Sequence, residues 1–294
     1  MALFALLLAT SARAETSLVE HYQNLKNGLV TMLPDSRISL TSSEQDDLLS
    51  AEVNSLLAVP FDVVVSALAQ AGNWCQVLPL HFNIKACTLK NQGSHDLLTV
   101  YSGRKIYETP ADSYAMTYQF EVIKQDDSQL SLRLHADDGP MDTHDYLIEL
   151  DAMPVAEGTM LHIHSSYRPS WLSSMLTSTY LSTLGRHKTG FSLAEQDGEM
   201  LPVKGIKGII ERNVMRYQLA IDTFLSAQSR SGAIQHDEIL ENWFKQNERY
   251  PQLHEMDKAE YLVIKQQEWQ NQQQLQLALN KSLQLAEAPK LNDD

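Results

Sequence analysis

The sequence is poor in cysteine, in positive charge and in recognisable catalytic motifs. It has two cysteines in 294 residues and no second pair spaced to complete a zinc shell. Lysine and arginine number 23 against 37 acidic residues, and the net charge of -14 disfavours a nucleic-acid partner. A GxSxG elbow, a Walker loop and an HExxH motif are also absent. We therefore predict no cofactor and no metal, and the usual support for hydrolases, nucleotide-binding proteins and zinc proteases is missing.

The first 14 residues have the features of a secretory signal. The apolar run Ala2–Ala9 is too short to cross a bilayer, and Ala12-Arg13-Ala14 forms a small-x-small cleavage pattern. A buried N-terminal helix is the alternative, because no positive side chain precedes the run. We expect cleavage after Ala14 and a periplasmic or secreted protein.

The two cysteines, Cys75 and Cys87, are twelve residues apart. In an oxidising compartment, an isolated pair of this kind is more often bridged than free. We predict a disulfide that joins a helical segment to the strand after it.

Hydrophobic periodicity divides the remainder into an N-terminal helix and linker (15–47), a central domain (48–228) and a helical C-terminal extension (229–294). The N-terminal part contains one amphipathic pattern, Ser17–Met32, and a polar passage, Pro34–Asp47. We expect a helix followed by a linker.

The central domain opens with an apolar strand pattern over Leu48–Val59. Apolar residues then recur at helical spacing over 61–68, after Pro60, and Gly72 stands where a helix stop is expected. Asn73 is the predicted cap of a second, shorter helix.

Six further strand-like runs follow, and each ends at residues that are typical of turns. We expect them at Ile84–Leu89, Leu97–Tyr107, Tyr114–Ile123, Leu130–Ala136, His144–Asp151 and Thr159–Tyr167. Short turns between successive runs predict an antiparallel meander. A short amphipathic helix, Ser170–Leu184, and a long one, Ile206–Gln228, complete the domain.

This order of elements resembles the START-like (SRPBCC, helix-grip) superfamily, which includes polyketide-cyclase-like and lipid-binding proteins. A local pattern carries the resemblance further, in Pro60, Phe61, Val64, Asn73, Trp74 and Pro79. The resemblance implies an α+β fold, in which a curved antiparallel sheet wraps around a long C-terminal helix. Together with the predicted signal, it suggests an exported bacterial member of the superfamily. It also implies an apolar cavity for lipids, sterols, polyketides or other hydrophobic molecules. The helix inserted at Ser170–Leu184 and the C-terminal extension depart from the simplest family pattern.

Large side chains provide candidate ligand-binding residues. Tyr114, Met116, Tyr118 and Phe120 share one face of a strand, although such stripes are also typical of ordinary core. Tyr217 belongs to the buried stripe of the long helix.

Further candidates are polar or lie on the inserted helix. Arg212 and Arg216 share a helix face and could hold a carboxylate or an anionic headgroup, or pair with acidic residues of the strand turns. Trp171 and Met175 could belong to a mobile apolar lid that contacts a membrane transiently, or simply pack against the sheet edge.

Two histidine patterns are the weak catalytic or ion-binding candidates. His162 and His164 alternate on one face of the last strand and could present two imidazoles to a metal or a proton, with no third ligand fixed by the sequence. Solvent exposure explains the same spacing. The hairpin His135–Asp145 gathers four aspartates and two histidines, but misses the calcium-loop spacing.

The sequence favours a non-catalytic protein that binds a hydrophobic small molecule or lipid. One alternative is a cyclase-like or hydratase-like enzyme that uses His162 and His164. Another is an envelope interaction protein that docks on a protein partner through the helices of residues 235–285.

Overall fold

The computed structural model describes residues 18–27, 33, 37–92, 95–170, 188–196, 198–230 and 235–287. Its centre is an eight-stranded antiparallel sheet with the order β1-β2-β8-β7-β6-β5-β4-β3. The strands are β1 (Ile38–Gln45), β2 (Leu48–Leu57), β3 (Ile84–Gln92), β4 (His95–Ser102), β5 (Tyr114–Gln125), β6 (Leu130–Asp138), β7 (His144–Val155) and β8 (Gly158–Arg168). The predicted meander is confirmed, because β3 to β7 each pair with the next strand along the chain, and β8 also pairs with β2.

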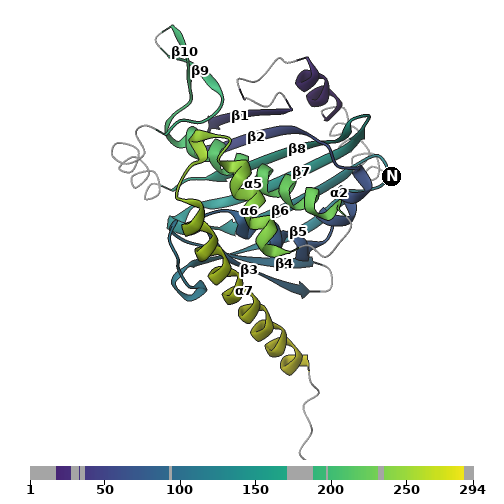
Figure 1. Cartoon of the computed structure of the whole chain (residues 1–294), viewed down its shortest axis with the longest axis vertical. Helices are drawn as coiled ribbons and strands as arrows, with labels where there is room; N and C mark the ends of the chain where they lie inside the picture. Colours follow the sequence, from purple (N-terminus) through teal and green to yellow (C-terminus); the bar gives the residue numbers. More distant parts are fainter. Residues whose placement is uncertain are drawn as a thin grey trace, which may run out of the picture.

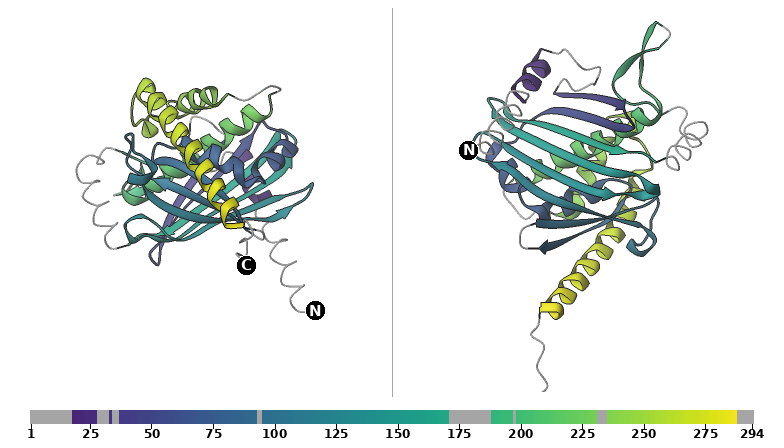
Figure 2. Two further views of the ribbon diagram at one scale, coloured as in Figure 1. Left: turned by 90° about the horizontal axis from the view of Figure 1, so that it is seen from below. Right: turned by 180° about the vertical axis from the view of Figure 1, so that it is seen from behind.

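Helices cover one face of this sheet (Figure 1). They are α2 (Phe61–Leu68), α3 (Ala71–Val77), α5 (Gly205–Gln228), α6 (His236–Asn247) and α7 (Lys258–Glu287), with the short turns η1 (Leu78–Leu80) and η4 (Pro251–Leu253). Figure 2 shows the sheet from behind, with α5 on its far side. A small hairpin of β9 (Leu193–Gln196) and β10 (Glu199–Pro202) precedes α5. The predicted α+β helix-grip fold and the helical extension are confirmed.

A single large core lies between the sheet and α5. Alternate side chains of each strand point into it: in β6, Leu130, Leu132 and Leu134 are buried, whereas the residues between them are partly exposed. From α5, Met215 and Leu219 enter the same core. Each leucine buried in this way stabilises the fold by about 2 kcal/mol.

The Asn-Trp pair after the first helix fastens α2 to α3. Trp74 Nε1 donates to the carbonyl oxygen of Leu68 at 2.9 Å, and Asn73 Nδ2 donates to that of Ala67 at 2.8 Å. The last carbonyls of a helix lack intrahelical partners, and these two side chains supply them. The chain therefore turns back at the end of α2, and Trp74 enters the core.

The predicted roles of Gly72 and Asn73 at this turn are wrong. Gly72 lies inside α3, and α2 closes at Ala69 with ordinary helical angles (φ -69°, ψ -9°). The residue that precedes α3 is Gln70. No left-handed residue is needed here because the side chains of Asn73 and Trp74 satisfy the helix end instead.

The polar passage predicted as a linker contains β1. Ile38 and Leu40 are buried, and β1 pairs with β2 from Ile38 opposite Ser55 to Gln45 opposite Leu48. The turn between the strands has left-handed backbone at two successive aspartates, with φ of 50° at Asp46 and 60° at Asp47. Two residues of positive φ match the geometry of a tight hairpin, and Asp tolerates them better than most residues. The strand was missed because only its first half is apolar.

The N-terminal helix packs on the other face of the sheet. Of the predicted span Ser17–Met32, residues 18–26 are helical. Leu18 and Leu25 form a small second core with Met160 of β8. The next residue, Leu161, belongs to the main core. Because neighbouring strand residues point to opposite faces, this helix lies on the face away from α5.

The C-terminal extension packs along the edge strand β3. Cys87 N donates to Gln272 Oε1 at 2.7 Å, and Gln272 Nε2 donates to Cys75 O at 2.9 Å. One turn further, Gln276 accepts from Leu89 N at 2.8 Å and donates to Leu89 O at 2.9 Å. Two glutamine amides of α7 thus occupy backbone groups that a ninth strand would otherwise pair.

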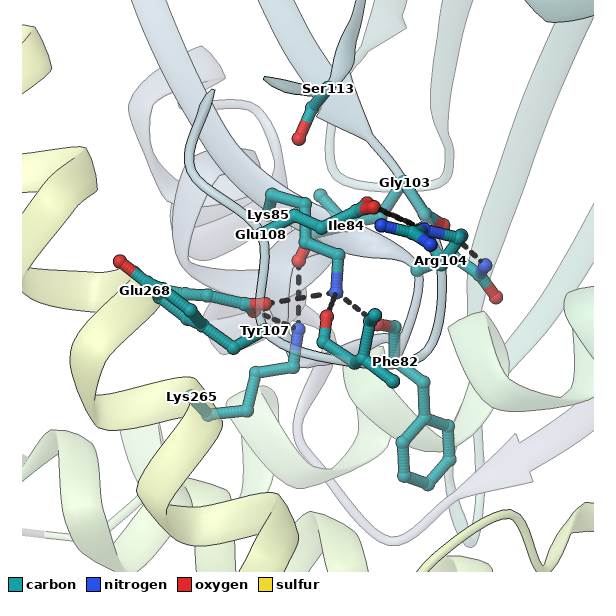
Figure 3. A network of polar contacts seen from close by, with 12 residues as sticks. Phe82, Ile84, Lys85, Gly103, Arg104, Tyr107, Glu108, Ser113, Lys265 and Glu268 are labelled. Atoms are coloured by element: carbon teal, nitrogen blue, oxygen red, sulfur yellow. Dashed lines mark hydrogen bonds and ion pairs between the residues drawn. The ribbon is translucent and has the colours of Figure 1, made fainter. Parts of the chain in front are cut away.

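A buried ion network fixes the start of α7 (Figure 3). Glu268 accepts from Lys85 of β3 at 2.9 Å and from Lys265 at 2.8 Å, and all three side chains are at most 3% exposed. The remaining ammonium protons reach main-chain carbonyl oxygens, of Phe82 and Ile106 for Lys85 and of His81 and Ile84 for Lys265. Burial lowers the pKa of Lys265 to about 8. Removing Glu268 would leave two buried ammonium groups without a counter-charge.

The final part of α7 projects beyond the sheet (Figure 1). Leu277 and Leu285 are both largely exposed there. No single helix in the described part of the chain is long and apolar enough to cross a membrane, and only α2 combined with the segment 71–80, at a bend of 95°, meets the length and hydropathy criteria.

The predicted disulfide is confirmed. Cys75 of α3 and Cys87 of β3 are bonded, with their Cα atoms 4.9 Å apart. The bond joins the helical segment to the next strand, at the point where Gln272 also contacts the backbone of both cysteines.

Replacing both cysteines by serine should lower the free energy of unfolding by about 3 kcal/mol, because a loop of this length loses its closure constraint in the unfolded chain. Urea unfolding at pH 7 measures the difference. Two reactive thiols in the denatured but unreduced wild-type chain would contradict the bond itself.

The double variant Gln272→Ala/Gln276→Ala should lose roughly 2 to 4 kcal/mol, because buried main-chain groups of β3 lose their partners. Gln274→Ala is the matched control, since Gln274 is exposed on the same helix. Equal unfolding midpoints for the double variant and the control would show that the amide contacts do not hold α7.

Candidate ligand site

The inner face of β5 carries the predicted ligand-binding stripe. Met116, Tyr118 and Phe120 are each at most 7% exposed and belong to the main core, whereas Tyr114 is 41% exposed at the strand start. Trp74 lies 6.3 Å from Phe120, ring centre to ring centre. The alternation of the strand was therefore predicted correctly, with Tyr114 at its outer end.

Tyr217 of α5 faces a buried imidazole that sequence analysis did not identify. Its ring stacks on His81, with ring centres 5.0 Å apart. His81 follows η1 and is 3% exposed. No sequence pattern marked His81 as a site residue, because a single histidine between apolar residues is also typical of an ordinary core position.

His81 is a neutral imidazole with one unused donor. Burial lowers its pKa well below the ordinary value, and the charges of Arg216 and Lys105 lower it further. Nδ1 accepts a hydrogen bond from the backbone N–H of Asn83 at 3.1 Å, so the proton resides on Nε2. Nε2 is buried and makes no hydrogen bond of normal geometry, although the side chain of Asn213 lies near enough to raise the pKa slightly. An enclosed N–H donor without an acceptor is the kind of group that a ligand can satisfy.

Several tyrosine side chains lie in the interior near His81 and Tyr217. Burial raises the pKa of Tyr118 and of Tyr217, and the nearby Tyr217 adds to the rise at Tyr118. Tyr146 and Tyr167 stack with ring centres 5.1 Å apart, and the hydroxyl of Tyr146 bonds to Thr143 at 2.7 Å. The hydroxyls of Tyr118 and Tyr217 add two polar groups to a largely apolar core.

Positive charge gathers around Arg216. Glu255, between η4 and α7, is 2.6 Å from Lys105, 2.5 Å from Lys188 and 2.5 Å from Arg216. Burial alone would raise the pKa of Glu255, but Arg216 and Lys105 lower it to about 2. Burial, followed by Arg216, lowers the pKa of Lys105 to about 8. Three cations thus surround one carboxylate, and together the four groups carry an excess of positive charge.

The two arginines predicted to bind an anion are both held by protein groups. Arg212 Nη1 donates to the carbonyl oxygen of Thr189 at 3.0 Å, and Arg216 donates to that of Leu253 at 3.2 Å as well as to Glu255. The alternative prediction, pairing with acidic residues of the strand turns, is wrong for Arg216. Its acidic partner comes from the C-terminal extension, which has no sequence pattern linking it to α5.

The remaining predicted positions lie away from this site. Trp171 and Met175 fall outside the described residues. His162 and His164 project from β8 to the sheet face opposite α5, because Leu161 and Ile163 between and beside them enter the main core. The hypothesis of an enzyme with pocket histidines therefore loses both residues, and the buried histidine beside Tyr217 is His81.

On that outer face, His162 has a distinct electrostatic environment. Burial lowers its pKa to about 4, and the neighbouring His21 contributes in the same direction. The hydrogen bond from His164 lowers the pKa of Glu52 on the adjacent strand.

Two surface hollows lie away from Tyr118 and Tyr217. A groove of about 580 Å³ runs between α7 and the edge formed by α3 and β3, with Gln272 and Gln276 in its wall. A second hollow, of about 390 Å³, opens near the end of β5 beside Phe120. Phe120 is the one predicted ligand-binding residue in the walls of these two hollows.

No protein-family model and no curated protein sequence matches the chain. Solved structures do match. A STAR-related lipid transfer protein from Xanthomonas axonopodis is 17% identical, over 54% of this chain and 95% of that chain, with a TM-score of 0.37. Human StAR-related lipid transfer protein 5 is 8% identical, over 59% of this chain and 90% of that chain, with a TM-score of 0.34.

A di-domain ARO/CYC from the steffimycin biosynthetic pathway is 10% identical, over 62% of this chain and 51% of that chain, with a TM-score of 0.38. These TM-scores are low. We therefore assign the helix-grip fold from the strand order and the long helix of this chain itself. START-like proteins are its structural neighbours.

Glu255→Gln tests the charge cluster through pH. The folded pKa of about 2 is below the usual 4.5, so ionised Glu255 stabilises the fold fully above pH 4.5 and this contribution is lost as the pH falls towards 2. The expected loss in the variant at pH 7 is about 3 kcal/mol. Urea unfolding between pH 2 and 7 measures it, with Glu241→Gln, in an exposed pair with Lys258, as the control. An unchanged pH dependence in Glu255→Gln would contradict the cluster.

Proposed function

We propose that this protein binds, without catalysis, a hydrophobic small molecule or lipid that carries an acidic group. The apolar part of the ligand lies between the inner face of the sheet and α5, near Tyr118 and Tyr217. The acidic group lies towards Lys105 and Lys188. The observation that supports this most directly is the crowding of three cations around the single carboxylate of Glu255.

The polar groups in this part of the core support an amphiphilic ligand over a purely apolar one. His81 Nε2 is a buried donor without a hydrogen bond of normal geometry, and two tyrosine hydroxyls lie in the same part of the core. A ligand oxygen would satisfy such a donor, and burial strengthens the interaction. Lys105 and Lys188 keep part of their side chains accessible, at 33% and 27% exposure, so an anion can approach them.

Export is part of the same proposal. The disulfide between Cys75 and Cys87 supports an oxidising compartment, because such bonds are rare in reducing ones. The proposed mature protein begins at Glu15 and acts in the periplasm or outside the cell.

Paired fluorescent probes test the proposed ligand class. cis-Parinarate and its methyl ester have the same apolar chain, but only the first carries a carboxylate. Both should bind the wild-type protein, and Lys105→Gln/Lys188→Gln should weaken parinarate binding at least about tenfold, or about 1.4 kcal/mol, while leaving ester binding unchanged. Lys245→Gln/Lys281→Gln removes the same charge from exposed helix positions and is the matched control.

Different failures of this experiment carry different meanings. Absence of binding by both probes, together with a bare mass in native mass spectrometry of the gently purified protein, would contradict the binding function. Equal weakening of both probes in Lys105→Gln/Lys188→Gln would contradict recognition of the acidic group.

A further inference from the structure

Metal-ligating side chains from three separate segments meet on the outer face of the sheet. His162 lies on β8, Glu52 lies on the adjacent β2, and His21 comes from the helix over residues 18–26. One ligand atom from each lies within 4.8 Å of the others. Among the described residues, this is the one such group of three. His164 adds a second imidazole of β8, with Nδ1 3.7 Å from Glu52 Oε1.

Strand pairing holds Glu52 and His162 in place. In the register of β2 with β8, Glu52 is directly opposite His164, and Asn54 is directly opposite His162. Both histidines therefore share a face with the carboxylate, because residues two apart on a strand point the same way. Two ligands on paired strands form a rigid base for a third that arrives from elsewhere.

The Asn54 side chain selects the useful tautomer of His162. Asn54 Oδ1 lies 2.9 Å from His162 Nδ1, so the amide oxygen accepts the Nδ1 proton. The Nε2 lone pair of a neutral imidazole is then available to a metal. A hydrogen bond of this kind, from the second ring nitrogen to a fixed acceptor, is the usual support of a metal-binding histidine.

His21 of the N-terminal helix lies directly beside His162. Its ring lies parallel to that of His162, within 12°, at a centre-to-centre distance of 4.5 Å. This stacking brings the ring nitrogens of both histidines to the same small region of the sheet surface. The small core of Leu18, Leu25 and Met160 brings the helix to the sheet and therefore places His21 beside His162.

Two other carboxylates on this face are already engaged. On β7, Glu149 pairs with Arg133 at 2.9 Å, and Asp151 bonds to Ser131. Glu52 is the carboxylate grouped with His21 and His162, and its Oε1 lies 3.7 Å from His164 Nδ1.

We propose that His21, Glu52 and His162 form a binding site for a divalent transition-metal ion of the zinc class, with His164 beside Glu52 as a positioning residue or a fourth ligand. Two histidines and one carboxylate are a known donor set for Zn²⁺. Ligand atoms around a tetrahedral Zn²⁺ are about 3.3 Å apart for bonds of about 2.0 Å, so side-chain rotation must bring the three groups closer than they stand here. The ion would fasten the N-terminal helix to the sheet.

Zinc titration of the untagged, metal-free chain tests the site. Isothermal calorimetry should show one Zn²⁺ per chain, and His162→Ala and His21→Ala should each weaken binding at least about 100-fold. Asn54→Ala should weaken it about 10- to 100-fold, as expected for a group that orients a ligand. His144→Ala is the matched control: His144 is an exposed histidine beside an aspartate, outside the group, and its loss should leave zinc affinity unchanged.

Absorption spectroscopy distinguishes a specific tetrahedral site from non-specific metal binding at the surface. Co²⁺ in place of Zn²⁺ should give the intense visible absorption of a tetrahedral ion in the wild-type chain and in His144→Ala, but not in Glu52→Gln, which keeps the size of the side chain. Zinc should also raise the Tm of the wild-type chain and leave that of His21→Ala unchanged. Equal zinc affinity in the wild-type chain, His21→Ala and His162→Ala would overturn the proposal.

Discussion

The structure depends on how the free edge of β3 is covered. An open sheet leaves unpaired backbone groups on its last strand, and such an edge can recruit other chains. Here the cover is a helix, whose Gln272 and Gln276 side chains bond to the backbone as a neighbouring strand would. The ion network around Glu268 fixes the same helix at its start. Because α7 is held in this way, the segment before it brings Glu255 to Arg216, so the candidate ligand site includes the C-terminal extension.

The two faces of the sheet have separate roles. The inner face and α5 enclose the large core, with aromatic rings and a small number of polar groups beside a cationic cluster. The outer face has a much smaller core, and its polar side chains meet the N-terminal helix. The alternation of the strands produces this division, since each strand contributes to both faces. A hydrophobic ligand and a metal ion would therefore bind without competing for the same residues.

Local patterns allowed most of the fold to be predicted. The period of two along β5 and the helical spacing in α5 both correspond to the structure, and so does the bridge between Cys75 and Cys87. The strand β1 was missed because its second half is polar and its turn consists of two aspartates rather than glycine or asparagine.

The sites were harder to predict, because their residues are distant in the chain. The amide of Gln272 meets Cys87 across 185 positions, and no periodicity encodes such a contact. His162 was identified as a candidate with a missing partner. That partner, His21, belongs to a helix whose apolar pattern indicates that it packs, but not where. His81 carried no pattern at all, and its significance lies in the burial of a donor that only the folded chain reveals.

The helix α7 lies far along the chain from β3, the strand whose edge it covers. Any process that delivers the polypeptide from its N-terminus, whether synthesis or passage through a membrane pore, presents β3 long before Gln272 arrives. At 5 to 20 residues per second, the 185 intervening positions take roughly 10 to 40 s to synthesise. The edge strand is therefore open to partners from other chains during this interval, and the last helix ends that exposure. The C-terminal extension thus covers the edge of β3 only at the end of synthesis. Chains truncated before α7 would keep this edge uncovered.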